Sequence, residues 1–258
     1  MCCAPVNPLN LEGKHVYVTG GGGGLGLALM RLVVPLGPNV SFVTKDLVKA
    51  KNVVEELESL RVRPDQKIVA VSADLSDYEQ ARRAFEQAVE RQNGQTPDLT
   101  IMCAGFAKAG LFTEVEPNAL KQPRPGPRVD SEKAMDGYYY VQAWTAQSLA
   151  RDKKPGTIVF ISNFLSTISY AGYSPVAPAR YAVKGLYDTL SSELEPYGIK
   201  VLLFEVSGQF GGGFDVEQDA KPEVTRVLDR ENGYVRLDEA VEAPKILNGK
   251  SLHNERLN

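Results

Sequence analysis

A run of five glycines between a strand-like and a helix-like segment limits the folds open to this chain more than any other feature. Residues 15–19 read H-V-Y-V-T, residues 20–24 are all glycine, and residues 25–36 follow with an apolar helical pattern. In this order glycines permit a tight turn and let the backbone approach a pyrophosphate, whose charge then lies at a helix N-terminus. The segment therefore predicts the phosphate-binding turn of a dinucleotide-binding domain rather than a flexible linker.

Strand-like and helix-like patterns alternate after this turn. Further strands are expected at residues 40–44, 68–71, 99–103, 158–161 and 201–204, and helices at residues 47–60, 136–151 and 181–195. Ser76, followed by Glu79 three residues later, forms a capping-box pattern for another helix. The alternation predicts an α/β fold, a Rossmann-type doubly wound parallel sheet in a single domain.

The whole chain, residues 1–258, is expected to form that domain, because an α/β unit of this length often folds around one core. Its nucleotide-binding part is predicted at residues 12–110. Residues 117–131 are predicted to form a loop, since the prolines of Q-P-R-P-G-P-R at residues 122–128 suit neither a helix nor a central strand. The substrate side and a C-terminal lid are expected at residues 160–258.

Charge and composition exclude several classes of function. The formal net charge of −3 provides no basic surface for nucleic acid, and no apolar run reaches the roughly 18 residues of a membrane span. The three cysteines form neither a disulfide framework nor a zinc pattern, and His15 and His253 have no metal-ligand setting. We therefore expect a cytoplasmic protein with no membrane span, no nucleic-acid partner and no metal.

Residues 19–26 read T-G-G-G-G-G-L-G and match the pattern T-G-x-x-x-G-x-G of short-chain dehydrogenases/reductases, which the chain resembles from about residue 12 to 210. Asp74 matches the family's acid beside the adenine ring, and Cys103-Ala104-Gly105 match the end of its N-N-A-G motif. The resemblance implies a nicotinamide nucleotide as cofactor. The cofactor-binding residues that it implies are Gly20, Gly22, Gly23, Gly24, Leu25, Gly26, Thr44, Lys45, Asp74, Leu75, Cys103, Ala104, Gly105, Arg180 and Gly208.

The residues that follow the second expected strand favour NADP(H) over NAD(H). An NAD enzyme places an acid there for the ribose 2′-hydroxyl, and such an acid would repel a 2′-phosphate. This chain has Thr44 and Lys45 instead, and both can bind a phosphate. Lys45 as an ordinary solvated lysine is the alternative for this detail.

The catalytic residues of the family are replaced in this chain. The family's Y-x-x-x-K motif falls on Val176 and Arg180, and its serine falls on Asn163. In the family the tyrosine protonates the developing alkoxide, the lysine lowers the pKa of the tyrosine, and the serine orients the carbonyl. Because valine has no proton to give, we expect ketone reduction to be slow or absent.

Two chemistries do not need that proton. An iminium carbon is already cationic and can accept hydride directly, and a pericyclic cyclisation needs only a dry pocket that holds a near-attack pose. With its substitutions the chain resembles the fungal NADPH-dependent bifunctional reductase/Diels–Alderases of prenylated indole alkaloid biosynthesis. That resemblance implies reduction of a cyclic iminium-type intermediate coupled to an intramolecular 4+2 cyclisation, with Asn163, Arg128 and Arg180 as the catalytic residues.

Two other functions stay open. Residues 134–144 and 221–225 resemble fungal 3-ketodihydrosphingosine reductases, which implies a degenerate ketoreductase with residual activity. A pseudoenzyme that binds NADP(H) without turnover is the second alternative. For Asn163 two origins stay open as well, a native residue or an engineered replacement of an aspartate.

Aromatic residues after the expected strand ends predict an apolar substrate pocket, because open parallel sheets bind ligands at the carboxyl ends of their strands. The predicted pocket residues are Phe106, Phe164, Tyr173, Val176 and Phe210. Such walls suit a hydrophobic small molecule, and the alkaloid resemblance implies a prenylated indole alkaloid. By analogy with the family, apolar faces on the helices at residues 136–151 and 181–195 imply a homodimer or homotetramer.

Overall fold

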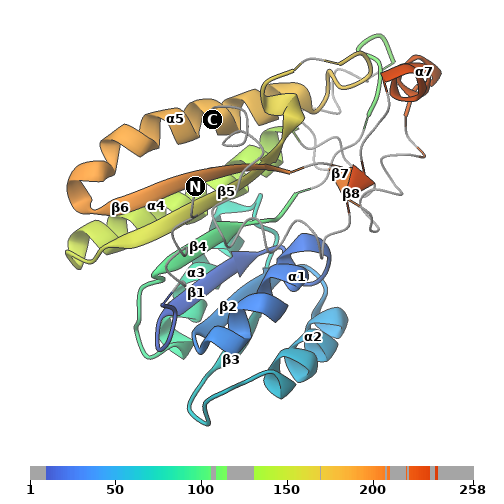
Figure 1. Ribbon diagram of the computed structural model, residues 1–258. Coiled ribbons are helices and arrows are strands. Elements are labelled where there is room, and N and C mark those ends of the chain that lie inside the picture. The colour runs from blue at the N-terminus through green and yellow to red at the C-terminus, as the bar shows by residue number, and fades with distance from the viewer. Residues whose placement is uncertain are drawn as a thin grey trace, which may run out of the picture.

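Six parallel strands form one sheet, in the spatial order β3-β2-β1-β4-β5-β6 (Figure 1). These strands are β1 (His15–Thr19), β2 (Asn39–Thr44), β3 (Ile68–Ser72), β4 (Leu99–Met102), β5 (Gly156–Asn163) and β6 (Ile199–Val206). The computed structural model describes residues 10–105, 109–114, 131–168, 170–206, 208–209, 219, 221–232 and 236–237. The expected α/β doubly wound fold is confirmed.

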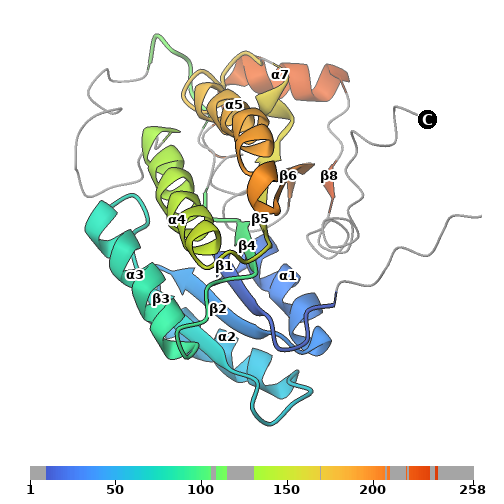
Figure 2. The same ribbon diagram turned by 90° about the vertical axis from the view of Figure 1, so that its left-hand side faces the viewer.

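Helices cover the two faces of the sheet. On one face α1 (Gly24–Val33) and α2 (Leu47–Ser59) pack against the strands. On the other face lie α3 (Tyr78–Arg91), α4 (Ser131–Arg151) and α5 (Ala177–Glu193), with α4 and α5 side by side in Figure 2. The shorter elements are η1 (Val34–Leu36), η3 (Phe164–Ser166), η4 (Glu195–Tyr197), β7 (Gly208–Gln209), α7 (Glu223–Asn232) and β8 (Arg236–Leu237).

The order of the strands determines where a ligand can enter. From β1 the chain moves outward through β2 and β3, and it then returns to β4 on the other side of β1. The connections after β1 and β4 therefore leave the sheet in opposite directions, which opens a crevice at the carboxyl ends of these two strands. All five residues of β1 and all four of β4 are buried, so both strands hold the floor of that crevice rigidly.

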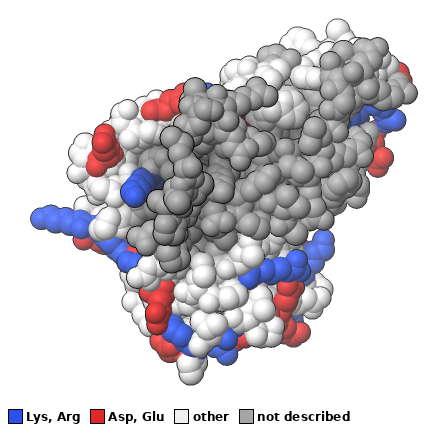
Figure 3. All heavy atoms as spheres, viewed as in Figure 1, with Lys and Arg blue, Asp and Glu red and all other residues white. Residues whose placement is uncertain are grey.

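The described surface carries charges of both signs. On the face shown in Figure 3, cationic and anionic side chains are interspersed around the lower half of the molecule. Among the described helices, none combines the length and the apolar character that a membrane span requires. Tyr139 on α4 is 57% exposed and Tyr181 on α5 is 42% exposed, so the helices expected to pair subunits do present apolar rings. The dimer or tetramer itself stays a prediction.

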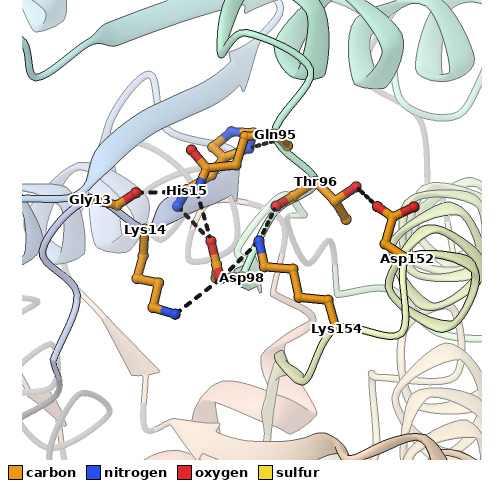
Figure 4. Close-up of polar contacts among 8 residues, drawn as sticks. All are labelled: Gly13, Lys14, His15, Gln95, Thr96, Asp98, Asp152 and Lys154. Atoms are coloured by element: carbon orange, nitrogen blue, oxygen red, sulfur yellow. Dashed lines mark hydrogen bonds and ion pairs between the residues drawn. The ribbon is translucent and has the colours of Figure 1, made fainter.

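A buried histidine, His15, lies at the amino end of β1 (Figure 4), whereas the crevice lies at the carboxyl ends of the strands. The Nδ1 atom of His15 is 2.7 Å from the carbonyl oxygen of Gln95, and its Nε2 atom is 3.0 Å from Oγ of Ser41. The carboxylate of Asp98 accepts a hydrogen bond from the backbone N–H of His15 at 2.9 Å and pairs with Lys154 at 2.9 Å. Burial lowers the pKa of His15 to about 4, because water no longer solvates its charged form.

Acid should therefore destabilise the protein through His15. The folded-state pKa lies below the ordinary value of 6.5, so the stabilisation is complete above that pH and is lost as the pH falls toward 4. The difference between the two pKa values corresponds to roughly 3 kcal/mol of unfolding free energy. Urea denaturation at pH 7 and pH 4 should show a smaller loss of stability for His15→Gln than for the wild-type chain. Equal losses in the two proteins would contradict this assignment.

Candidate nucleotide-binding site

Two glycines in the turn between β1 and α1 are required by close packing. Gly20 has a φ of +70°, and a Cβ there would lie 2.8 Å from the Cα of Ala104. At Gly26, a Cβ would lie 2.5 Å from the carbonyl oxygen of Gly20. Any side chain at either position would meet backbone atoms that cannot move aside, so these two glycines fix the shape of the turn.

Gly23 in the same turn faces open space, since no atom lies within 4 Å of the place where its Cβ would stand. It is the N-cap of α1, where no side chain caps the helix, and the first turn of α1 contains no acidic residue. The positive end of the helix dipole therefore stays available to an anion. This geometry fits a pyrophosphate at the start of α1.

A cavity of about 410 Å³ opens beside this turn. Its walls come from the ends of β1 to β4, from the segments that follow them and from α4. The lining residues are Gly20, Gly22, Gly23, Val43, Thr44, Lys45, Asp46, Lys49, Ala73, Asp74, Leu75, Ser76, Met102, Ala104, Gly105, Gly137 and Tyr138. Its size is within the range of ligand and cofactor sites.

The part of the cavity beside β2 and β3 is polar. The ammonium of Lys45 lies 3.0 Å from Oδ2 of Asp74, which joins the segments that follow these two strands. The Oδ1 atom of Asp74 accepts hydrogen bonds from the backbone N–H and the hydroxyl of Ser76. Burial acts to raise the pKa of Asp74, but the hydrogen bonds from Ser76 and Lys45 outweigh it and hold that pKa below its ordinary value. Asp74 therefore stays ionised at neutral pH and is an acceptor at the edge of the cavity.

Most of the predicted cofactor residues meet around this cavity. The lining includes Gly20, Gly22, Gly23, Thr44, Lys45, Asp74, Leu75, Ala104 and Gly105. The other predicted residues with described surroundings, which do not line it, are Gly24, Leu25, Gly26, Cys103 and Arg180. For Gly208 the structure describes only the backbone strand β7, so its part in the site stays a prediction. Burial raises the pKa of the Cys103 thiol to about 12, so that side chain is neutral and unreactive.

Sequence reasoning missed four lining residues that carry polar groups, Asp46, Lys49, Ser76 and Tyr138. For Lys49 the signal was present, because it follows Lys45 by four residues at the start of an expected helix. For Tyr138 there was none, since the packing of α4 against the strand ends brings it to the cavity.

Two of the predicted catalytic and pocket residues lie between the end of β5 and the start of α5, and both contact neighbouring protein groups. Asn163 ends β5 and caps η3, where its Oδ1 accepts a hydrogen bond from the N–H of Leu165 at 3.2 Å. Val176 precedes α5 and is 6% exposed, in a cluster with Ala109, Leu165 and Tyr173. A nonpolar, buried side chain thus stands where the family's tyrosine is expected.

The predicted substrate wall is only partly described. Tyr173 is buried at 1% exposure, while the half-buried Phe164 makes an edge contact with Tyr170 at 5.9 Å between ring centroids. Phe106, Phe210 and the predicted catalytic Arg128 lie outside the described residues. The substrate pocket as a whole therefore stays a prediction.

Arg180 lies on α5 and reaches the end of β4. Its guanidinium donates a hydrogen bond to the hydroxyl of Tyr138, and its Nη2 atom is 3.8 Å from the place where a Cβ on Gly105 would stand. Since Tyr138 and Gly105 both line the cavity, Arg180 provides a fixed positive charge beside its inner end.

Comparison with known proteins supports this assignment. The family model described as short chain dehydrogenase matches residues 14–208. A 3-ketodihydrosphingosine reductase of Cryptococcus neoformans is 38% identical over 222 residues, covering 84% of this chain and 63% of the relative. Another from Aspergillus fumigatus is 28% identical, covering 86% of this chain and 65% of the relative. The chain thus spans slightly less than two thirds of the length of these relatives.

Solved structures show the same fold. A short-chain type dehydrogenase/reductase from Mycobacterium ulcerans superposes with a TM-score of 0.75 at 19% identity, covering 93% of this chain and 84% of that protein. The family match runs from β1 to the end of β6 and includes the whole glycine turn, and NADP(H) is the cofactor of this site. On this evidence the chain belongs to the short-chain dehydrogenase family.

Proposed function

We propose that this chain is an NADP(H)-dependent oxidoreductase of the 3-ketodihydrosphingosine reductase type that keeps the cofactor site and lacks the usual proton donor. The observation that carries the proposal is the buried Val176 before α5, with Arg180 one helical turn later. The names of the relatives favour a long-chain 3-keto sphingoid base, or a ketone similar to it, as substrate. Such a substrate is a hydrophobic small molecule.

The chain's residues would divide the work of holding the cofactor. The turn at Gly20 to Gly26 would bind the pyrophosphate, and Thr44, Lys45 and Asp74 would bind the adenosine end. Arg180 would meet the ribose next to the nicotinamide. NADPH supplies a hydride when it is bound.

Proton transfer is the step that these residues support poorly. Val176 cannot donate a proton, and Asn163 does not titrate. Burial raises the pKa of Tyr138 to about 12, and the hydroxyl already contacts two backbone carbonyls. Lys184 forms an ion pair at 2.7 Å with Asp188, one turn later on α5. Since general acid catalysis contributes about 10²–10⁴-fold, ketone reduction should be slower by that factor than in a family member with the tyrosine.

A second candidate function is the reduction of a cyclic iminium coupled to a 4+2 cyclisation, on a prenylated indole alkaloid. What supports it is that Val176 has no proton to donate and Asn163 does not titrate, while iminium reduction needs no proton donor. The relatives named above are sphingoid reductases rather than Diels–Alderases, so the ketone substrate is the better supported of the two.

Loss of NADPH absorbance with each substrate class tests the proposal. The wild-type chain should consume NADPH slowly with 3-ketodihydrosphingosine. Rapid turnover of a cyclic iminium with none of the ketone would favour the second candidate. Binding of NADPH with no turnover of either substrate would indicate a pseudoenzyme.

Lys45 should determine the preference for NADPH. Replacing it with glutamine removes a cation that lies 3.0 Å from Asp74 at the polar end of the cavity, where we place the 2′-phosphate. NADPH affinity should fall about tenfold while NADH affinity stays unchanged, since a charge-assisted bond to phosphate is lost. Nucleotide fluorescence titration measures both. Lys51→Gln is the matched control, because Lys51 is an exposed lysine of α2 outside the cavity lining. An equal loss for both nucleotides would contradict the assignment.

A further inference from the structure

The hydroxyl of Tyr138 joins three elements at the inner end of the cavity. Tyr138 lies on α4 at 3% exposure, and its ring stacks on Phe160 of β5 with 6.2 Å between centroids. The hydroxyl oxygen is 2.9 Å from the carbonyl oxygen of Met102 at the end of β4 and 2.8 Å from that of Ile161 in β5. The single phenolic proton is thus directed at backbone carbonyls of two neighbouring strands.

The same hydroxyl also accepts a hydrogen bond from Arg180 of α5. A phenol oxygen can donate one hydrogen bond and still accept another, so its contacts with Arg180 and the carbonyls are compatible. Burial raises the pKa of Tyr138 to about 12, with the charge of Arg180 acting in the opposite direction. Tyr138 therefore keeps its proton at neutral pH, and its hydroxyl is committed to structural contacts rather than to acid catalysis.

These contacts restrict a side chain that is otherwise long and flexible. An arginine side chain loses considerable rotamer freedom when one geometry is imposed on it. Here the contact with the phenol holds the guanidinium, and its Nη2 atom lies 3.8 Å from the place where a Cβ on Gly105 would stand, at the cavity wall. Lys45 follows β2 and Asp74 follows β3, whereas Met102, Gly105 and Arg180 lie around the end of β4 and the start of α5. The two groups of residues thus serve different parts of the site.

We propose that Tyr138 is a positioning residue, which holds the guanidinium of Arg180 against the nicotinamide-ribose part of the bound NADP(H). This inference assumes the part of the proposed function that concerns NADP(H) binding, and it does not depend on which substrate is reduced. Tyr138 acts through Arg180 and does not take part in the chemistry. Without its hydroxyl, Arg180 keeps its charge but loses its fixed direction.

Binding of two nucleotides tests this inference without any turnover. NADPH contains the nicotinamide ribose, whereas 2′,5′-ADP contains only the adenosine end. Tyr138→Phe keeps the aromatic ring and removes the hydroxyl, so NADPH affinity should fall about tenfold while 2′,5′-ADP affinity stays within about twofold, as expected for one lost hydrogen bond to a charged group. Tyr139→Phe is the matched control, because Tyr139 is the exposed neighbour on the same helix.

A double-mutant cycle separates positioning from general destabilisation. Arg180→Gln should weaken NADPH by a similar factor, and adding Tyr138→Phe to it should cause no further loss, because the two changes remove one shared contact. If Tyr138→Phe does not fold, Arg180→Gln alone should still weaken NADPH binding and leave 2′,5′-ADP binding within about twofold. Equal weakening of NADPH and 2′,5′-ADP, additive losses in the double variant, or unchanged NADPH affinity in both single variants would overturn the inference. Rapid ketone reduction by the wild-type chain would instead contradict only the proposed function.

Discussion

Replacing Val176 with tyrosine, Arg180 with lysine and Asn163 with serine in one protein should raise NADPH-dependent reduction of 3-ketodihydrosphingosine by about 10²–10⁴-fold. The three changes restore, at the positions to which we assign the family motif, an acid for the alkoxide, a cation that lowers its pKa and a hydroxyl that orients the carbonyl. The cofactor turn is untouched and lysine keeps a positive charge at position 180, so the gain should appear in kcat more than in the affinity for NADPH. Steady-state rates over a range of ketone concentrations measure it.

The matched control is the same triple variant with phenylalanine in place of tyrosine at Val176. Val176 is 6% exposed and packs with Leu165 and Tyr173, so a larger ring has to be accommodated in both proteins equally. Thermal melting and NADPH titration verify that both variants fold and bind. Comparable rates in the tyrosine and phenylalanine versions, or no gain in a folded tyrosine version that binds NADPH, would contradict the assignment of Val176 to the donor position.

Gly23→Val should abolish measurable NADPH binding, with a loss of about a hundredfold or more in affinity, equivalent to ~2.7 kcal/mol. Gly23 lines the cavity, and the space for its Cβ is open, so a branched side chain there would project into the place we assign to the pyrophosphate. Its φ of 170° is extended backbone that valine adopts readily. The fold should therefore survive. Calorimetric titration with NADPH measures the loss.

Substitutions at two other glycines provide comparisons for this experiment. Gly185→Ala on the exposed side of α5 also meets no atom within 4 Å, and it should leave NADPH affinity unchanged. Gly20→Ala should instead destabilise the protein itself, because its Cβ would lie 2.8 Å from backbone at a φ of +70°. Tight NADPH binding by a folded Gly23→Val protein would place the nucleotide elsewhere.

The strands and the cofactor turn could be predicted because their signals are local. Each strand is a short apolar run, and the glycines lie directly between β1 and α1. The predicted ends of helices were less accurate, because a proline and a side-chain cap determine where two of these helices end or begin. The helix expected over residues 25–36 ends as an α-helix at Val33, and Pro35 continues it as the 3-10 turn η1. The expected cap at Ser76 was wrong, since Asp77 caps α3 and Ser76 bonds to Asp74 instead.

The side-chain contacts at the inner end of the cavity could not be predicted from the sequence. Tyr138 lies on α4 and contacts the ends of β4 and β5, at residues 36 and 23 positions away, so no short spacing pattern in the sequence predicts these contacts. Asn163 was expected in the chemistry, and the structure shows its side chain bonded to the N–H of Leu165. The catalytic and pocket roles of Asn163, Tyr173 and Val176 stay predictions, because a buried packing position and a functional position look the same in a sequence.

The most direct test of an intact cofactor site without a proton donor combines binding and turnover on one sample of the wild-type chain. NADPH fluorescence is titrated to saturation, 3-ketodihydrosphingosine is then added, and the consumption of NADPH is followed beside the triple variant. We predict saturable binding followed by consumption at least about a hundredfold slower than in that variant. Rapid consumption by the wild-type chain, or no saturable binding of NADPH, would contradict it.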